Sequence, residues 1–482
     1  MWIASWLNSD YKKKLYQYHP DRPALQLDTF RTRLKNRLEP ADPPNLERGV
    51  RQLLSDKVSG NMVGLWLLAP EHLRLGTWDL LCAWTKQATE RVEPRLALQM
   101  VHEAALGVTG VRQSRSLSQK GFELLNGLPF VASDQAMHHL LQAHSVAEAE
   151  ALQVHLGMVR RARGHYQGKL LAIDPHRIRS YSKRQMCRYR GDDVSKPFKI
   201  AQTFFCLDAD THQPVCFTIG SSALSVRQAT PELLRLASAI LNPPAKQSLV
   251  IADTEHYTAE LIEQVRTHTP FDLLVPMPNS KLRQTQMRQL SPDCFTPRWA
   301  GLATAKVPFQ IESQQTVAQG TQYIQRSGER SEEYEFKGFF STRDGPEADD
   351  MTLAYPKRWH VEEFFHAHQA LGWQRAGTPN LNIRYAQMSM ALIAQTAIHQ
   401  FRQRLGTPWE QWDATHMAKA IFRGIDGDVR VGNDTILVTL YNAPQVEQMR
   451  KHYERLPDKL AAEHVDPRIP WLYGYKLDFR FK

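Results

Sequence analysis

Three acidic residues stand where carboxylates can do chemistry: Asp174, Asp253 and Glu362. Asp174 closes the apolar run K-L-L-A-I-D, and Asp253 closes the similar run S-L-V-I-A-D. In sheets flanked by helices, reacting groups tend to lie just outside strand ends. A single Asp after a strand is most often a turn residue or a helix cap, so neither Asp argues for chemistry alone. The argument depends on the three together.

Glu362 belongs to the stretch Y-P-K-R-W-H-V-E-E-F-F-H-A-H-Q at 355–369. Its spacing predicts a helix in which Tyr355, Arg358 and Glu362 share one face, because residues three and four apart lie over one another. Only Glu362, and not Glu363, keeps register with the other two. The apolar residues form a separate stripe that packs inward, so the polar face remains available to a ligand.

Carboxylates at strand ends and on a facing helix are suited to hard divalent cations such as Mg²⁺ or Mn²⁺, which prefer oxygen ligands and share them with phosphate groups. Two such ions about 3.5–4 Å apart activate the attacking oxygen and stabilise the leaving oxygen of an in-line phosphoryl displacement. We therefore expect phosphodiester chemistry with two metal ions.

These residues resemble the DDE transposases of bacterial insertion sequences, in particular the insertion sequence four-like group. The resemblance rests on Y-x-x-R-x-x-x-E from Tyr355 to Glu362, on V-I-A-D-T-E-H-Y around Asp253 and on L-A-I-D-P-H-R-I around Asp174. It covers about residues 166–405. It implies an RNase H-like catalytic core that nicks DNA at element ends and joins the freed 3′ hydroxyl to a target. Asp174, Asp253 and Glu362 would be its metal ligands.

The resemblance also implies contacts to DNA. Tyr355 and Arg358 would hold phosphates at the cleaved end. Where the family pattern carries a Lys seven residues after the Glu, this chain has Gln369, an amide without the point charge. Relatives use an aromatic residue of an insertion and one of the catalytic helix to handle an unpaired base. Trp299 and Trp359 are the candidates here; packing remains open for Trp359 and is the simpler interpretation for Trp299.

The positioning elements follow from the periodicity of the sequence. Strands are predicted at 169–174, 199–208, 214–220, 248–253 and 271–278, with helices at 230–241 and 258–266. The order strand, strand, strand, helix, strand, helix, strand predicts a mixed sheet with helices on its faces. A long apolar helix ending at Gly406 is expected to pack behind the catalytic helix.

The fold class expected is multidomain α+β: an RNase H-like mixed sheet flanked by helices, interrupted by a β-rich insertion, with an all-helical N-terminal domain. Thr77, Ser133 and Ser145 are predicted helix N-caps. The helical domain either contacts DNA ends or only packs, and transposase C-terminal regions often serve dimerisation. The predicted parts are a basic segment at 1–45, the helical domain at 46–165, the catalytic domain at 166–405 with its insertion at about 279–350, and a C-terminal region at 406–482.

Charge favours a polyanionic partner. The chain carries a formal net charge of +10 and has a sequence pI of about 9.3. A basic cluster follows Asp174, and we expect phosphate contacts from it, although solvated charge is the plainer alternative. Its predicted DNA-binding members are Arg177, Arg179, Lys183, Arg184, Arg188 and Arg190.

Composition excludes several classes. The five cysteines are scattered without a C-x-x-C pair, which argues against a disulfide framework and a zinc site. No apolar run reaches the length of about 18 residues expected of a membrane span, and the first residues lack the pattern of a secretory signal. A cytoplasmic protein, associated with the nucleoid when bound to DNA, is expected.

The function expected is that of a Mg²⁺- or Mn²⁺-dependent DNA transposase acting as a homodimer in a synaptic complex. Its partners would be double-stranded DNA, both the terminal inverted repeats and the target. Two alternatives remain open: a metal-dependent nuclease that cuts without joining, and a transposase-derived DNA-binding protein without catalysis.

Overall fold

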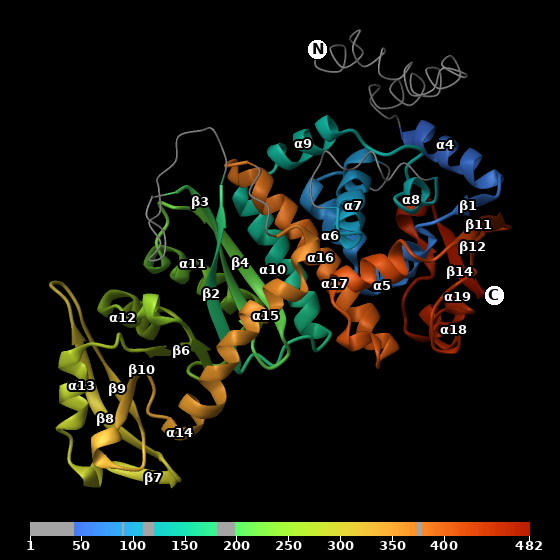
Figure 1. Cartoon of the computed structure of the whole chain (residues 1–482). Coiled ribbons are helices and arrows are strands. Elements are labelled where there is room, and N and C mark those ends of the chain that lie inside the picture. Colours follow the sequence, from blue (N-terminus) through green and yellow to red (C-terminus); the bar gives the residue numbers. More distant parts are fainter. Residues whose placement is uncertain (1–42, 89–90, 109–119, 181–197, 374–377) are drawn as a thin grey trace, which may run out of the picture.

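The computed structural model describes residues 43–88, 91–108, 120–180, 198–373 and 378–482. Helices gather at one end and in the middle of the molecule, and strands extend to the other end (Figure 1). Within the described residues, no helix has both the length and the apolar character needed to cross a membrane. The described part of the chain is a mixed α+β structure with two sheets.

The larger sheet has nine strands in the order β4-β3-β2-β5-β6-β10-β9-β8-β7. β5 pairs in parallel with both β2 and β6, and the other neighbours are antiparallel. The predicted order of elements from β2 to β6 is confirmed. The strands are β2 Leu170–Arg179, β3 Ile200–Asp208, β4 Gln213–Ser221, β5 Ser248–Ile251, β6 Phe271–Pro276, β7 Phe295–Trp299, β8 Leu302–Glu312, β9 Val317–Ser327 and β10 Glu335–Ser341.

Helices cover both faces of this sheet. The covering helices are α11 Val226–Leu241 and α12 Ala259–His268 on one face, and α15 His360–Ala367 and α16 Leu381–Leu405 on the other. Leu171 and Ile173 of β2 belong to the core with α11 and α12, whereas Leu170 and Ala172 belong to the core with α15 and α16. Because side chains alternate along a strand, Asp174 lies on the face of α15 and α16.

The strands predicted at 248–253 and 271–278 end two residues earlier, at Ile251 and Pro276, and β2 differs most from its prediction. The expectation that Asp174 ends its strand is wrong, because β2 continues to Arg179. The antiparallel partner β3 pairs as far as Arg179↔Ile200, whereas pairing with the parallel partner β5 ends at Ala172↔Ile251. The residues after Asp174 lack an apolar run, and it is the ladder to β3 that keeps them extended.

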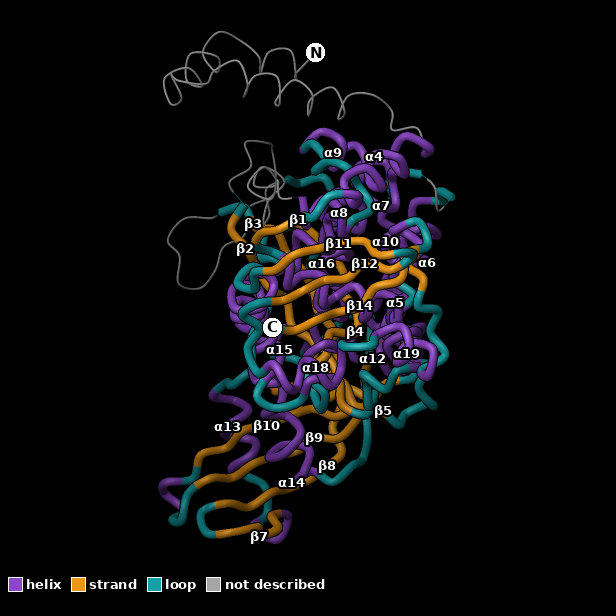
Figure 2. Tube along the Cα trace, turned by 90° about the vertical axis from the view of Figure 1, so that its right-hand side faces the viewer, coloured by secondary structure: helices purple, strands orange, loops and turns teal. Residues whose placement is uncertain are grey.

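The strand-rich insertion continues the same sheet. β10 pairs with β6, and β9, β8 and β7 follow outward (Figure 2). α13 Lys281–Arg288 and these strands enclose a small core that includes Met287, Phe295, Ile324 and Phe336. The insertion is therefore connected to β6 by backbone hydrogen bonds.

The described part of residues 43–162 is mostly helical, and two of its predicted caps are confirmed. Ser133 Oγ accepts from the Ala136 N–H, and Ser145 forms a capping box with Glu148. The prediction for Thr77 is wrong, since Thr77 is the first residue inside α6 and its hydroxyl instead bonds His72 Nδ1 at 3.1 Å. The helices are α4 Pro43–Ser55, α5 Ala69–Leu75, α6 Thr77–Thr85, α7 Val92–Ala105, α8 Lys120–Leu125, α9 Asp134–Ala143 and α10 Val146–Ala162.

A second sheet joins residues 58–60 to strands of the C-terminal region in the order β1-β11-β12-β14-β13. β1 comes from the N-terminal half and pairs with β11, so the prediction of an entirely helical stretch at 46–165 is wrong at residues 58–60. Three residues are too few to show a period of two in a sequence. The elements are β1 Val58–Gly60, β11 Gly427–Gly432, β12 Thr435–Leu440, β13 Arg468–Ile469, β14 Tyr475–Phe481, α18 Val446–Tyr453 and α19 Leu456–Ala462.

The long helix α16 ends at Gly406, as predicted, and its buried side chains connect the sheet to the helices. Around its C-terminal part, Glu71 is fully buried and pairs with Arg74 at 2.9 Å and with Arg404 at 3.1 Å. Gln400 and Tyr453 also donate hydrogen bonds to this carboxylate. Glu71 thus joins α5, α16 and α18.

Glu71→Ala is expected to lower the free energy of unfolding by about 3–5 kcal/mol, because the buried Arg74 side chain would lose a main counter-charge. Denaturant unfolding followed by circular dichroism measures this. Glu447→Gln is the matched control, since its ion pair with Arg450 is exposed and such pairs contribute about 0–1 kcal/mol. Equal stability of the two variants would contradict the role of Glu71.

Candidate active site

Asp174 and Asp253 lie at the same level of the sheet. The parallel pairing of β2 with β5 ends at Ala172↔Ile251, and each Asp follows two residues later. Beyond this point the two segments are no longer paired with each other, and side chains at such strand ends are available for chemistry. Asp174 remains in β2, and Asp253 becomes the N-cap of the short helix at 254–256. Register alone therefore brings these two carboxylates together.

The third carboxylate comes from a helical segment of mixed type. A π-helical turn, Asp350–Ala354, leads into a 3-10 turn, Tyr355–Trp359, and then into α15. Pro356 in the 3-10 turn explains part of the irregularity, because it lacks the N–H that an α-helical bond needs. The expected single helix over 355–369 is therefore corrected: its α-helical part ends at Ala367.

The apolar stripe of this segment packs as predicted. Val361, Phe364 and Phe365 are buried, and the ring of Phe365 lies edge-on to Phe205 of β3 with centroids 5.0 Å apart. Phe365 also stacks on His176 of β2, with centroids 4.2 Å apart, so the segment lies along β2 and Arg358 reaches Asp174. The polar face thus meets the strand ends.

Arg358 connects two of the three carboxylates. Its Nη1 donates to Asp174 Oδ1 at 3.0 Å, and its Nη2 donates to Glu362 Oε1 at 3.2 Å. The three side chains are largely shielded, with 14% exposure for Arg358, 16% for Asp174 and 36% for Glu362. The guanidinium therefore neutralises a site that is otherwise acidic.

The two Asp residues differ in their ionisation. The pKa of Asp174 is raised to about 7, mainly by burial; the charges of Asp253 and Glu362 contribute to the rise, and Arg358 opposes it. Burial also acts to raise the pKa of Asp253, but the hydrogen bond and charge of His256 outweigh it and lower the value. A pair of nearby carboxylates with opposite shifts is typical of a functional site.

Asp253 is oriented by its own short helix. His256 Nδ1 lies 2.6 Å from Asp253 Oδ1, and the Glu255 N–H donates to the same oxygen at 3.1 Å. Outer contacts of this kind hold a carboxylate in a defined direction. The sequence analysis missed His256, although the spacing of Asp and His in D-T-E-H was a visible signal.

Tyr355 lies beside Arg358 at the start of the segment. Its ring packs edge-on against Phe339 of β10, with centroids 4.9 Å apart. Burial raises the pKa of the Tyr355 hydroxyl, although the positive charge of Arg358 acts in the opposite direction. At neutral pH, Tyr355 is therefore a neutral hydrogen-bond donor near the carboxylates.

The donor set is chemically suited to Mg²⁺ or Mn²⁺, because it consists of three carboxylates whose mutual repulsion is visible in the raised pKa of Asp174. Arg358 lies between Asp174 and Glu362. Among the described residues, the group of three ligand atoms that lies within 4.8 Å is a different one, His212, His360 and Glu363. The carboxylates are thus gathered around a guanidinium.

The basic residues after Asp174 are described in part. Arg177 donates to Gln202 and, with both terminal nitrogens, to Glu255 next to Asp253. Arg179 lies over the ring of Phe198, 4.5 Å from its centroid. Lys183, Arg184, Arg188 and Arg190 lie outside the described residues, as does segment 1–42. Phosphate contacts from this cluster remain a prediction.

The two candidate stacking residues are exposed but well separated. Trp359 is 58% exposed and follows Arg358, whose guanidinium lies 5.3 Å from its ring. Trp299 is 59% exposed at the end of β7, so its interpretation as a packing residue is wrong. β7 is the outermost strand, and both views place it far from α15 (Figures 1 and 2).

The end of the segment departs from the family pattern. Gln369 begins the short turn Gln369–Leu371, and its side chain lies outside the described residues. His368 beside it is buried and stacks on Phe364 with centroids 4.7 Å apart. Burial lowers the pKa of His368 to about 4, so it carries no charge at neutral pH and does not replace the missing lysine.

The three carboxylates and Arg358 lie within a region that matches a known protein family. Residues 165–396 match a family model described as a transposase DDE domain, which supports a DDE transposase. No curated relative matches the chain by sequence. A solved structure, titled a cryo-EM structure of the piggyBac transposase synaptic complex with hairpin DNA, aligns with 11% identity and a TM-score of 0.39, covering 76% of this chain and 82% of that chain.

Proposed function

We propose that this chain is a DNA transposase that cleaves DNA at transposon ends and transfers the freed 3′ hydroxyl into a target. The observation that carries the proposal is the convergence of Asp174, Asp253 and Glu362 around Arg358, within the residues that match the transposase DDE domain. The closer assignment, a bacterial insertion sequence four-like enzyme with an RNase H-like core, belongs to the same proposal.

Asp174, Asp253 and Glu362 would hold two Mg²⁺ or Mn²⁺ ions, which supply activation of the attacking oxygen and charge neutralisation at the leaving oxygen. His256 keeps Asp253 Oδ1 in place. Arg358, an always-charged planar donor, releases its carboxylates and forms paired hydrogen bonds with a DNA phosphate. Tyr355 donates its hydroxyl to a neighbouring phosphate oxygen.

The partner of this site is double-stranded DNA, as terminal inverted repeats and as target. Arg179 and the rest of the basic cluster provide phosphate contacts near the carboxylates, and the net charge of +10 attracts DNA as a whole. The helical domain contributes to end binding, and the C-terminal region supports a homodimer that pairs two ends. The reaction takes place on bacterial DNA in the cytoplasm.

A supercoiled plasmid carrying the inverted repeats that flank the gene tests this function. Metal-dependent cleavage followed by joined product supports transposition. Cleavage without joined product supports a nuclease, and binding without metal-dependent cleavage supports a transposase-derived binding protein. Activity that persists in both Asp253→Ala and Glu362→Ala would overturn the assignment of the site.

Trp359→Ala is expected to weaken binding to an oligonucleotide end with an unpaired base by about 1–3 kcal/mol, since an exposed indole beside Arg358 stacks on any base. Fluorescence anisotropy in a Glu362→Gln background measures binding without cleavage. Trp359→Phe keeps a stacking face and should retain most of the affinity. Equal loss on fully paired DNA would contradict base stacking.

A further inference from the structure

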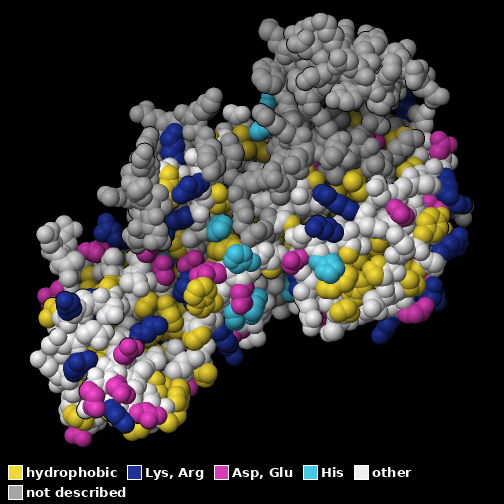
Figure 3. Space-filling model, viewed as in Figure 1, with side chains coloured by type: hydrophobic (Ala, Val, Ile, Leu, Met, Phe, Trp, Pro, Cys, Tyr) yellow, Lys and Arg dark blue, Asp and Glu magenta, His cyan; other side chains and the backbone are white. Residues whose placement is uncertain are grey.

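A second group of potential ligands lies on another side of the catalytic segment. His212 occupies the turn between β3 and β4, whereas His360 and Glu363 are three residues apart at the start of α15. Their ligand atoms lie within 4.8 Å of one another. In the space-filling view, histidine side chains gather in the hollowed middle of the molecule, next to acidic ones (Figure 3).

One imidazole has the outer contact expected of a metal ligand, and the other stacks on it. His360 Nδ1 lies 2.7 Å from the carbonyl oxygen of Ala209, which can only accept, so Nδ1 carries the proton and Nε2 keeps its lone pair. Such a bond to a backbone carbonyl is the usual outer contact of a metal-binding histidine. The ring of His212 stacks on that of His360, with centroids 3.8 Å apart and planes at 28°.

His212 adopts its position at a conformational cost. Its φ of 57° lies in the left-handed region, which a residue with a side chain visits infrequently. The nearby Lys357 is paired with Asp210 of the same turn at 2.6 Å. Glu363 is exposed, and no described residue donates a hydrogen bond to its carboxylate. A negative carboxylate and two imidazoles thus share one accessible corner.

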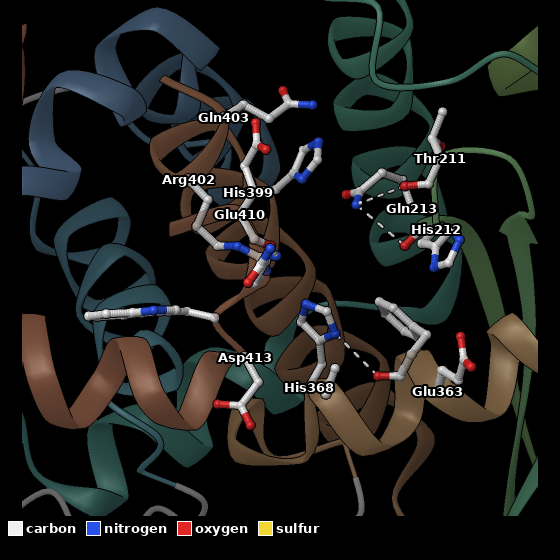
Figure 4. Close-up of a pocket in the computed structure, with 14 residues that line it drawn as sticks. Thr211, His212, Gln213, Glu363, His368, His399, Arg402, Gln403, Glu410 and Asp413 are labelled. Atoms are coloured by element: carbon white, nitrogen blue, oxygen red, sulfur yellow. Dashed lines mark hydrogen bonds between the residues drawn. The ribbon is translucent and has the colours of Figure 1, made fainter. Parts of the chain in front are cut away.

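This corner opens onto a cavity of about 370 Å³. Figure 4 shows His212 and Glu363 near each other at one side of the pocket, with His399 and Arg402 across from them. A site with three protein ligands leaves one position of a tetrahedron for water or a small ligand. The cavity provides room and access for that fourth ligand.

We propose that His212, His360 and Glu363 bind one zinc-class divalent cation at a site separate from the catalytic carboxylates. Two imidazoles and one carboxylate are ligands that Zn²⁺ prefers, whereas Mg²⁺ prefers oxygen alone. The sequence argument against a zinc site rested on the absence of a C-x-x-C pair. It does not apply to this site, which contains no cysteine.

The position of the site gives the cation a role. It ties the β3–β4 turn to the first turn of α15, and Glu363 directly follows Glu362. Cross-linking these elements holds the N-terminal end of α15 in place against the sheet, so the cation positions Glu362 without touching the reacting phosphate. The binding itself does not depend on the proposed transposase activity.

Zinc binding to the full chain in excess Mg²⁺ is the test, measured by calorimetric titration and by thermal unfolding. We expect one tight equivalent of Zn²⁺ and a rise in Tm. His212→Asn and Glu363→Gln should each weaken zinc binding by at least about 10- to 100-fold, because even substitution of a residue that only hydrogen-bonds a metal ligand causes such a loss. Asn is chosen at position 212 because it tolerates the left-handed backbone.

Two controls make the result decisive. His366→Asn, on the same helix, should leave the tight equivalent unchanged. A triple variant, Asp174→Asn with Asp253→Asn and Glu362→Gln, should also keep it, which separates this site from the catalytic one. The proposal is overturned by a chain that binds no tight zinc, by tight binding that survives in both His212→Asn and Glu363→Gln, or by its loss in the triple variant while that variant remains folded.

Discussion

Asp253→Ala and Glu362→Ala are each expected to lower the rate of DNA-end cleavage by about 10²–10³-fold or more, the loss seen when one group that stabilises a transition state is removed. Both side chains belong to the set whose charges raise the pKa of Asp174. Without either one, the oxygen ligands no longer suffice to hold the metal ions beside the phosphate. Nicking of a labelled end in Mg²⁺ measures the rate.

Residues that act as a unit give losses that do not add. The double variant Asp253→Ala with Glu362→Ala is therefore expected to be about as slow as the slower single variant. Glu447→Gln serves as the matched control, because Glu447 is an exposed carboxylate that pairs with Arg450 and with none of the site residues. Chelation of the metal should abolish cleavage by the wild-type chain, and cleavage that continues after chelation would count against the proposed chemistry.

Arg358→Ala is expected to change metal binding as well as activity. The guanidinium now occupies the space between Asp174 and Glu362 and competes with a cation for both. Its removal leaves three carboxylates without that counter-charge, so the metal-free variant should unfold at a lower temperature. Addition of Mn²⁺ should then raise Tm by more than in the wild type. Cleavage should nevertheless fall by about 10²-fold, because the phosphate loses its paired donor.

The effect of pH follows from Asp174. Its pKa in the folded chain is raised to about 7, above the ordinary value of 3.8, so the carboxyl group is protonated below about pH 7 and a proton competes with the metal. Raising the pH from 6 to 8 should therefore tighten Mn²⁺ binding. In Arg358→Ala the same rise should move to higher pH, since Arg358 is the main influence that lowers this pKa. An unchanged profile would show that Arg358 does not control Asp174.

The pH dependence of folding stability also follows from the raised pKa of Asp174. A raised carboxyl pKa means that the folded state binds the proton more tightly, so Asp174 stabilises the metal-free fold below about pH 4 and loses that contribution as the pH rises toward 7.

Arg358→Lys separates charge from geometry, because an ammonium keeps the charge but lacks the fork of two parallel donors. It should retain the pH profile better than it retains cleavage.

Much of the site was predictable from the sequence because periodic signals are strong there. The apolar runs before Asp174 and Asp253 gave the correct strand order, and helical spacing correctly placed Arg358 and Glu362 on one face. The expected strand end at Asp174 was wrong because a ladder to a neighbouring strand holds polar residues extended without an apolar pattern. Pairing between strands depends on two segments of the chain, whereas a periodic pattern describes only one of them.

Other features depend on contacts that no local pattern encodes. The bridging of Asp174 and Glu362 by Arg358 requires the fold to bring two distant elements together. The same holds for the exposure of Trp299, which follows from the outer position of β7 in the sheet. The group of His212, His360 and Glu363 is similar, since one of its members comes from a turn far earlier in the chain.

The pairing of β1 with β11 has a consequence for how the chain matures during synthesis. Residues 58–60 leave the ribosome long before their partners at 427–429. The same seam contains Trp471, whose indole N–H donates to the carbonyl of Leu125, and Tyr453, which donates to Glu71. Loop closure over so long a separation is slow. The packing of the N-terminal helices is therefore expected to be completed only after the strands that carry Asp174 and Asp253 have been made. A nascent chain stopped near residue 405 would leave the apolar surface of these helices exposed to chaperones.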